Sequence, residues 1–286
     1  MKKKVNIYWF VIIIAGLFSG CEKEIELELP VHQSIVVVEG WIEQNKYPEV
    51  ILSLSSPYFS SIDSLSILDY AVRSAKVTIY TDDDSEILLL SSNDKYFPPQ
   101  VYRARRIKGE VGKTYNIEVL FRGDTITAST TIPEPVAIDS FWFELAKNQD
   151  SLGYLYFSIT DNPNQKNYYR TLTRVQNQEE LFVPTRMSVY DDKYFNGEEI
   201  TFTMAREASS WMENSMDHYF KIGDTVDFKL CSIDKASYDF WNTYQNEILS
   251  SANPFASTNA RIKCNINHGY GVWYGSGVTF SSKIIK

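Results

Sequence analysis

The stretch SIVVVEGWI, residues 34–42, decides the fold class of this chain. Valine and isoleucine dominate it, and their β-branched side chains favour strands over helices. The polar segment EQNKYP at 43–48 follows, and the run EVILSLSS at 49–56 repeats the β-rich composition. Two such runs separated by a polar turn predict consecutive strands of a mainly β protein.

The same pattern continues through the first half of the chain. Further strands are predicted at 75–81, 87–92, 113–121 and 125–132. The acidic run at 82–86 is expected to be the turn across which 87–92 pairs back. The tripeptide RGD at 122–124 matches a known adhesion motif, but Gly123 suits the tip of a hairpin.

Two segments interrupt or end this first set of strands. Residues 58–75 are expected to form a loop with a short helical turn. The sequence PEP at 133–135 ends the pairing, because proline has no N–H to donate to a strand ladder. The strands in between predict an immunoglobulin- or transthyretin-like β-sandwich over residues 34–135.

The remainder, residues 136–286, is predicted to be a second β-rich domain that carries one amphipathic helix. The helix is expected at about 234–250, with Asp234 as its N-cap and with Trp241, Tyr244 and Ile248 on one apolar stripe. The turn NPNQ at 162–165 suits a hairpin. Strands are predicted at 137–145, 154–160, 167–176, 198–205, 225–233, 260–266 and 272–285.

The N-terminus has the features of a secretory signal. Lysines 2–4 precede the apolar run at 7–18, which is shorter than the roughly 20 residues that span a bilayer. Ser19, Gly20 and Cys21 resemble the bacterial lipobox, although Phe18 stands where leucine is usual. The resemblance implies that residues 1–20 are removed and that Cys21 is lipidated. Each buried acyl methylene contributes about 0.8 kcal/mol, so two or more chains anchor a protein stably.

The residues behind Cys21 are acidic and form a predicted tether, 21–33. The sequence EKEIELELP resembles the export signal that sends many lipoproteins of Bacteroidota to the outer face of the outer membrane. This implies a lipid-anchored protein of the outer membrane, and leaves open whether it is surface-exposed or faces the periplasm.

Composition excludes some functions and leaves others open. Aromatic residues make up 14% of the chain, too many for a disordered protein. The net charge is −8 and no basic stripe occurs, so we expect no nucleic-acid partner. His32, His218 and His268 lack zinc-ligand spacing, and the aspartates at 82–84 lack the spacing of a calcium loop. We therefore predict no metal, cofactor or catalytic residue.

Two features could still carry chemistry or recognition. Cys231 and Cys264 could form a disulfide in an oxidising compartment, or stay as two buried free thiols. The stretch HGYGVWYGSG at 268–277 offers Tyr270, Trp273 and Tyr274 as a candidate ligand or partner surface. The alternative is a glycine-bulged edge strand whose aromatic side chains fill the core.

Several stretches together, in their order and spacing, resemble one family of outer-membrane lipoproteins of Bacteroidota whose biochemical function is unassigned. They include VGKTYNIEV, TDNPNQKNYYR, YFNGEEITF and, as the most specific part, the ending NPF…NIxxGxGV. Here that ending is Asn253, Pro254, Phe255, Asn265, Ile266, Gly269, Gly271 and Val272. Members are typically encoded beside TonB-dependent receptors, which implies an accessory role in nutrient or metallophore import and assigns no catalytic residues.

Three functions of different classes therefore remain. The first is a non-enzymatic accessory binding or assembly component of a TonB-dependent import system, with that receptor as partner. The second is a surface glycan-binding or adhesion lipoprotein that uses Tyr270, Trp273 and Tyr274. The third is a carboxylate-dependent hydrolase, since a chain with 36 acidic residues could supply the necessary pair of carboxyl groups.

Overall fold

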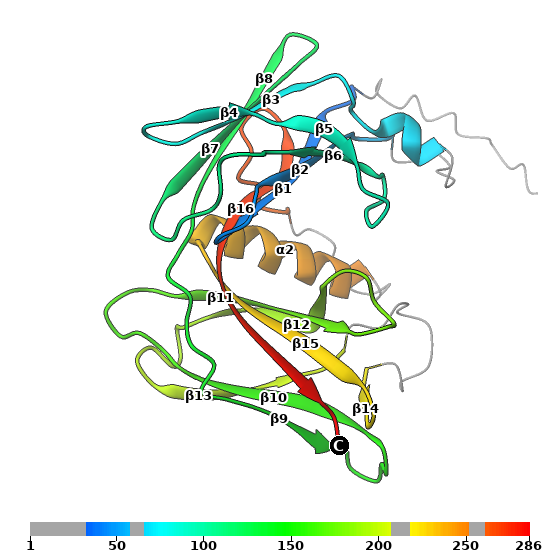
Figure 1. Ribbon diagram of the computed structural model, residues 1–286, viewed down its shortest axis with the longest axis vertical. Coiled ribbons are helices and arrows are strands. Elements are labelled where there is room, and N and C mark those ends of the chain that lie inside the picture. The colour runs from blue at the N-terminus through cyan, green and yellow to red at the C-terminus, as the bar shows by residue number, and fades with distance from the viewer. Residues whose placement is uncertain (1–32, 58–65, 207–217, 252–260) are drawn as a thin grey trace, which may run out of the picture. The chain divides into compact units, whose positions relative to one another are not determined.

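Eight strands form the largest sheet of the computed structural model, which describes residues 33–57, 66–206, 218–251 and 261–286 (Figure 1). The signal peptide, Cys21 and the tether as far as residue 32 lie outside the described residues. In spatial order the strands are β12 (Val183–Asp191), β11 (Tyr168–Val175), β15 (Thr225–Ile233), β16 (Tyr270–Ile284), β1 (Val36–Glu43), β2 (Glu49–Leu54), β6 (Gln100–Arg103) and β5 (Leu89–Ser92).

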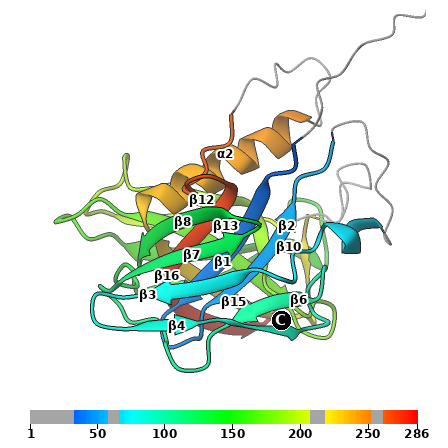
Figure 2. The ribbon, with the colours of Figure 1, turned by 90° about the horizontal axis from the view of Figure 1, so that it is seen from above.

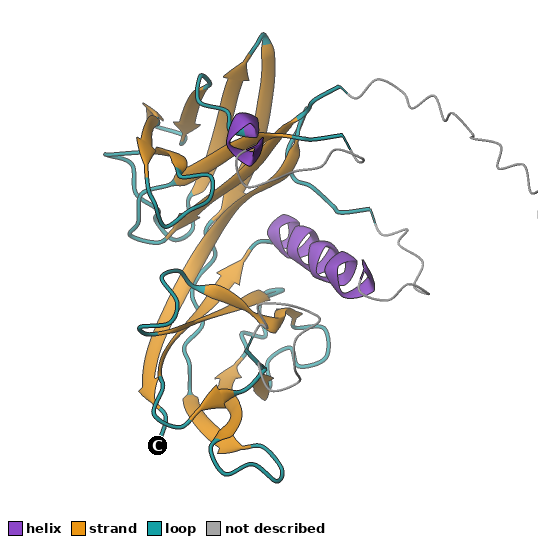
Figure 3. Cartoon of the chain, turned by 90° about the vertical axis from the view of Figure 1, so that its right-hand side faces the viewer, coloured by secondary structure: helices purple, strands orange, loops and turns teal. Residues whose placement is uncertain are grey.

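Two four-stranded sheets and two helices complete the described elements. One sheet runs β4 (Ser85–Ile87), β3 (Lys76–Tyr80), β7 (Thr114–Phe121) and β8 (Asp124–Thr131). The other contains β13 (Glu199–Met204), β10 (Leu152–Thr160), β14 (Phe220–Lys221) and β9 (Ser140–Leu145). The helices are the 3-10 turn η1 (Ser66–Tyr70) and α2 (Lys235–Ser251), which lies beside the strands in Figure 3. The prediction of a mainly β protein with sandwich-like packing and an amphipathic helix is confirmed.

Strand β16 connects the two halves of the chain. It pairs in parallel with β1, where Gly40 lies opposite Trp273, and antiparallel with β15, where Cys231 lies opposite Val278. In Figure 1 it runs from beside β1 to the C-terminus. The predicted boundary at 133–135 falls between β8 and β9, but the large sheet continues across both halves because the last strand returns to the first.

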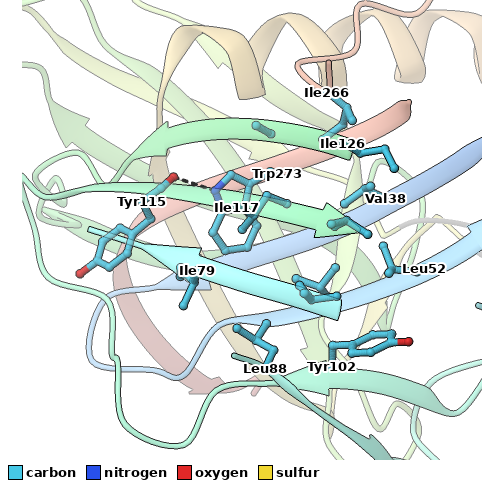
Figure 4. Close-up of a cluster of buried hydrophobic side chains, with 14 of the residues drawn as sticks. Val38, Leu52, Ile79, Leu88, Tyr102, Tyr115, Ile117, Ile126, Ile266 and Trp273 are labelled. Carbon is cyan, nitrogen blue, oxygen red and sulfur yellow. Dashed lines mark hydrogen bonds between the residues drawn. The ribbon is translucent and has the colours of Figure 1, made fainter. Parts of the chain in front are cut away.

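One face of the large sheet carries the first core. Alternate residues of a strand point to opposite faces, so Val36, Val38 and Ile42 share the face of Trp273. These side chains pack against the sheet of β3, β7 and β8, as Figure 4 shows. Gly40 makes room for the indole, since a Cβ there would lie 2.8 Å from the Trp273 ring. The Trp273 indole N–H donates to the Tyr115 carbonyl at 2.9 Å.

The same face carries the second core at the other end of the sheet. Phe228 and Leu230 of β15 pack against Leu155, Phe157 and Ile159 of β10. Phe157 and Phe228 have ring centroids 4.9 Å apart. Because both small sheets cover this one face, the opposite face of the large sheet is left for α2 and for the loops.

Helix α2 begins as its sequence predicts. The Asp234 carboxylate accepts the backbone N–H of Ser237 at 2.8 Å, which is N-capping. Its second oxygen accepts the Thr130 hydroxyl of β8 at 2.6 Å, and that hydroxyl accepts the backbone N–H of Gly275 at 2.8 Å. The cap therefore also ties the helix to β8 and β16.

Three local predictions are wrong. The turn at 162–165 joins β10 to β11, which belong to different sheets, so it is a crossover and not a hairpin. Buried Asp161 secures this crossover by accepting from the Tyr169 hydroxyl and the Gly197 N–H. The predicted strand at 260–266 is not a strand over its described part, where Asn265 instead bonds both the N–H and the C=O of Trp273 through its side chain. The strand predicted at 87–92 is interrupted at buried Leu88. Its first residue ends β4, which pairs with β3, and the residues after Leu88 form β5, which pairs with β6.

Replacing Trp273 by alanine should destabilise the fold by about 3–5 kcal/mol, because the change leaves a cavity in the first core and removes a buried hydrogen bond. Tyr270→Ala, in the same strand but 48% exposed, should cost no more than about 0.5 kcal/mol. Urea unfolding followed by circular dichroism measures both. Equal midpoints for the two variants would contradict the placement of Trp273.

Candidate functional site

A cleft of about 500 Å³ lies on the face of the large sheet opposite both cores. Charged and aromatic side chains supply most of its lining, and apolar side chains the rest. The lining comprises Glu39, Trp41, Glu43, Lys46, Tyr47, Glu49, Tyr96, Arg103, Arg170, Leu172, Leu181, Phe182, Pro184, Lys229, Trp241, Tyr244 and Tyr274.

The alternation of strand side chains builds this cleft. In β1, Glu39, Trp41 and Glu43 point away from the core that Val38 and Ile42 enter. Tyr274 of β16 is in register with Trp41 and lies on the same face. Helix α2 contacts β11, β12 and β16 and contributes Trp241 to the lining. In Figure 2 the helix is seen beside β12.

Arg170 of β11 is the most unusual lining residue. Its side chain is 6% exposed, and its Cζ lies 3.5 Å from the centre of the Trp241 ring. Nη1 makes a long contact of 3.4 Å with the Tyr274 hydroxyl, and Nε is buried without a hydrogen-bond partner. Within the described residues Arg170 forms no ion pair with a carboxylate at 4.0 Å or less. Buried charges are ordinarily paired, so this arrangement needs an explanation.

Two of the other three lining cations are paired, and the third, Lys46, is exposed to solvent and forms no ion pair with the described residues. The Lys229 ammonium donates to the Glu43 carboxylate at 2.7 Å and lies 4.4 Å from the centre of the Phe182 ring. Glu49 receives the Tyr96 hydroxyl at 3.0 Å and the Arg103 guanidinium at 3.3 Å. Two of the three glutamates that line the cleft are thus neutralised from within the chain.

Glu39 is the third glutamate, and its carboxyl remains accessible to solvent within the cleft. The surrounding walls displace much of the water around it, which raises the pKa of Glu39, and the positive charge of Arg170 offsets part of that rise. Burial also raises the pKa values of Tyr274 and Tyr96, so both phenols stay protonated at neutral pH. The cleft can therefore offer hydrogen-bond donors, the buried cation of Arg170 and the anion of Glu39 to a ligand.

The structure separates the three aromatic residues predicted to form a surface. Trp273 is fully buried in the first core, Tyr270 is half-exposed, and Tyr274 lines the cleft. A platform of all three does not exist, because Trp273 points to the opposite face of β16. The alternative, in which glycines accompany a core aromatic residue, holds for Trp273. Gly271 has a φ of +105°, and a Cβ there would lie 2.0 Å from the Val38 carbonyl oxygen.

Sequence reasoning missed Arg170 and Glu39 as site residues. The only sequence signal for Arg170 is that it is one of two arginines among the β-formers of YYRTLTRV, and surface strands often carry such residues. Its burial depends on Trp241, more than 60 residues later in the chain. Without knowledge of that contact, the arginine is indistinguishable from a solvent-facing one.

The remaining predicted chemistry has structural explanations. Cys231 and Cys264 are both free, so of the two alternatives that the sequence leaves open the structure has the free thiols and not the disulfide. Burial raises the pKa of the Cys231 thiol to about 12, and the Cys264 sulfur accepts the N–H of Gly271 at 3.3 Å. Among the aspartates at 82–84, Asp83 pairs with Lys113 and Asp84 with Arg106. Within the described residues, no group of three or more His, Cys, Asp or Glu side chains is placed to hold a metal ion.

Comparison with known proteins assigns a family. Residues 22–281 match the family described as "Domain of unknown function (DUF4249)". The chain belongs to this family. That result confirms the expected membership of an uncharacterised family, and DUF4249 carries no assignment of ligand or reaction.

Other comparisons add little beyond DUF4249. The solved structures that match include the selenomethionine-substituted chicken interferon gamma receptor alpha chain, at 7% identity, covering 70% of this chain and 89% of that chain. Its TM-score is 0.18, and a likeness at that level carries no argument. No curated protein matches the sequence. No helix in the described ranges is both long and apolar enough to cross a bilayer.

Replacing Glu39 by glutamine should raise the melting temperature at pH 7 and leave it unchanged near pH 4. The folded state raises the pKa of Glu39, so the unfolded chain ionises first as the pH increases above about 4.3. Stability is therefore lost as the pH rises from the unfolded towards the folded pKa. Thermal unfolding at both pH values measures the difference. The control is Glu180→Gln, at an exposed site outside the cleft; a stabilisation of Glu39→Gln that is equal at both pH values would contradict the reasoning.

Proposed function

We propose that this protein is a non-enzymatic lipoprotein of the outer membrane, anchored through Cys21, which serves as an accessory binding component of a TonB-dependent import system for a nutrient or metallophore. The cleft is the observation that supports binding. Its volume lies within the range of about 300–1,000 Å³ typical of small-molecule sites, and its aromatic walls with a few polar groups match their usual lining.

The predicted anchor supports a role beside a membrane receptor. The tether of residues 21–33, if fully extended, would span at most about 47 Å. A lipid on Cys21 would therefore confine the folded part of the chain to the neighbourhood of the membrane surface. A receptor barrel in the same leaflet would meet the cleft at high effective concentration, because both partners are confined to the membrane.

A carboxylate-dependent hydrolase is the weaker candidate for the same cleft. Glu39 has the raised pKa that suits a general acid, and Glu43 and Glu49 line the same cleft. Glycoside hydrolysis needs a second free carboxyl group. Glu43 is held by Lys229, and Glu49 by Arg103 and Tyr96, so the cleft leaves a single free carboxyl among its lining glutamates. This favours binding over catalysis.

Glycan binding would require a surface other than the predicted one. Trp142 of β9 stacks on Tyr156 of β10 with ring centroids 5.5 Å apart, on the face of that sheet turned away from the second core. Tyr154 lies on the same face and packs against Tyr219 at 5.0 Å. Stacked aromatic rings of this kind can support a sugar ring.

Pull-down of the full-length, C-terminally tagged protein from mildly solubilised outer membranes should recover a TonB-dependent receptor, identified by mass spectrometry. The matched control is Cys21→Ala, which cannot be acylated. This variant should lack the added mass of the lipid and should be absent from the membrane fraction. No receptor should be recovered with it. Recovery of no receptor by the intact, acylated wild type would refute the proposed partner.

A glycan array separates the adhesion alternative from the import role. If the protein binds glycans through the exposed sheet face, Trp142→Ala should abolish that binding and Tyr270→Ala should leave it unchanged. Absence of any glycan signal from the wild type would exclude this alternative. A signal lost in the Tyr270 variant and retained in the Trp142 variant would instead restore Tyr270 as the binding residue.

A further inference from the structure

Arg170 carries a buried charge that the chain does not neutralise. Taking an ion out of water costs several kcal/mol unless a partner of opposite charge compensates. The stacking on Trp241 compensates in part, since a cation–π contact attracts the guanidinium to the face of the indole ring. The described residues supply no carboxylate within ion-pair distance of the guanidinium. A bound anion would supply the missing compensation.

The orientation of the guanidinium suits an oxygen anion. Trp241 covers one face of its plane, and the hydrogen-bond donors lie along the edge of that plane. Nη2 makes no hydrogen bond with the described residues, and Arg170 lines the cleft. A planar carboxylate can receive two parallel N–H bonds from such an edge.

Glu39 supplies the opposite charge in the same cleft. Its carboxyl is influenced by the charge of Arg170, yet the two groups form no ion pair at 4.0 Å or less. Because Lys229 and Arg103 already pair with the other two glutamates, Glu39 is the lining carboxyl left for a ligand. One buried, unpaired cation and one unpaired anion therefore line the same cleft, while the other unpaired lining cation of the described chain, Lys46, is exposed to solvent.

Aromatic and apolar side chains line the rest of that space. Trp41 packs against Tyr96 with ring centroids 5.5 Å apart, and Trp241 meets Tyr274 edge-to-face at 5.6 Å. These walls favour a ligand with an apolar or aromatic body between its two charged ends.

We propose that the cleft binds a zwitterion of about dipeptide size, with its carboxylate on Arg170, its protonated amine on Glu39 and its apolar side chains against the aromatic walls. This inference rests on the proposed binding function of the cleft and adds its ligand class. A compact α-amino acid has its two charges close together, whereas a dipeptide separates them by one residue. A cleft of about 500 Å³ has room for the latter.

Isothermal titration calorimetry with L-phenylalanyl-L-phenylalanine and two derivatives tests the proposal, with the full-length lipoprotein in detergent micelles. One derivative has its carboxylate amidated, and the other has its amine acetylated. For the wild type, each modification should weaken binding at least tenfold, because each leaves one protein charge unpaired. Arg170→Gln should bind the amidated and parent dipeptides within about twofold of each other, and Glu39→Gln should do the same for the acetylated and parent dipeptides.

Controls separate a binding effect from misfolding and from failure of the import role. Arg122→Gln, at the exposed tip of the β7–β8 hairpin, should bind all three probes like the wild type. If Arg170→Gln does not fold, Arg170→Lys keeps the charge but loses the planar fork, and should weaken parent binding at least fivefold.

No binding of the parent dipeptide at 5 mM, or equal affinity of the wild type for a modified and an unmodified probe, would overturn the zwitterion site. Receptor recovery in the pull-down would be unaffected by that result, so the two proposals fail separately.

Discussion

The parallel pairing of β16 with β1 is the constraint on which the rest of the structure depends. It joins the last strand to the first, and β16 pairs on its other edge with β15. Both hydrophobic cores therefore pack on the same eight-stranded sheet, although each could have been built on a separate sheet. A glycine at position 40 permits this closure, because the Trp273 ring occupies the volume that a side chain there would fill. The hydrogen bond from Trp273 to the Tyr115 carbonyl then fixes the small sheet on top.

The two-residue period of the strands turns this shared sheet into a binding surface. Both small sheets cover the same face, so every second residue of β1 and β16 is directed to the other side. On that side the sequence places glutamates and aromatic residues in β1, a tyrosine in β16 and an arginine in β11. Packing alone would favour apolar residues beneath α2. A buried, unpaired arginine there lowers stability, and such a cost is characteristic of sites that bind ligands.

Local sequence predicted most elements but not their partners. The strands around residues 36–42, 114–121 and 225–233, the N-cap at Asp234 and the turn at Gly123 all follow from side-chain chemistry within a few residues. The pairing of β1 with β16 and the crossover after β10 depend on contacts far apart in the chain, for which no local signal exists. The cleft was not predictable for the same reason, since Arg170 is a site residue only because Trp241 covers it. The glycine-rich surroundings of Trp273 left two alternatives open, a surface residue or a core residue, and the structure has Trp273 in the core.

The double role of Asp234 limits how the cleft can change shape. One carboxylate oxygen caps α2 and the other holds Thr130, which in turn holds the backbone of β16. The N-terminal end of the helix is therefore pinned to the sheet by three hydrogen bonds in series. Gln245 attaches the helix a second time further along, because its side-chain oxygen accepts the backbone N–H and the hydroxyl of Ser188 in β12. The stack of Trp241 on Arg170 lies between these two attachments, so the wall of the cleft that α2 supplies is held on both sides of it.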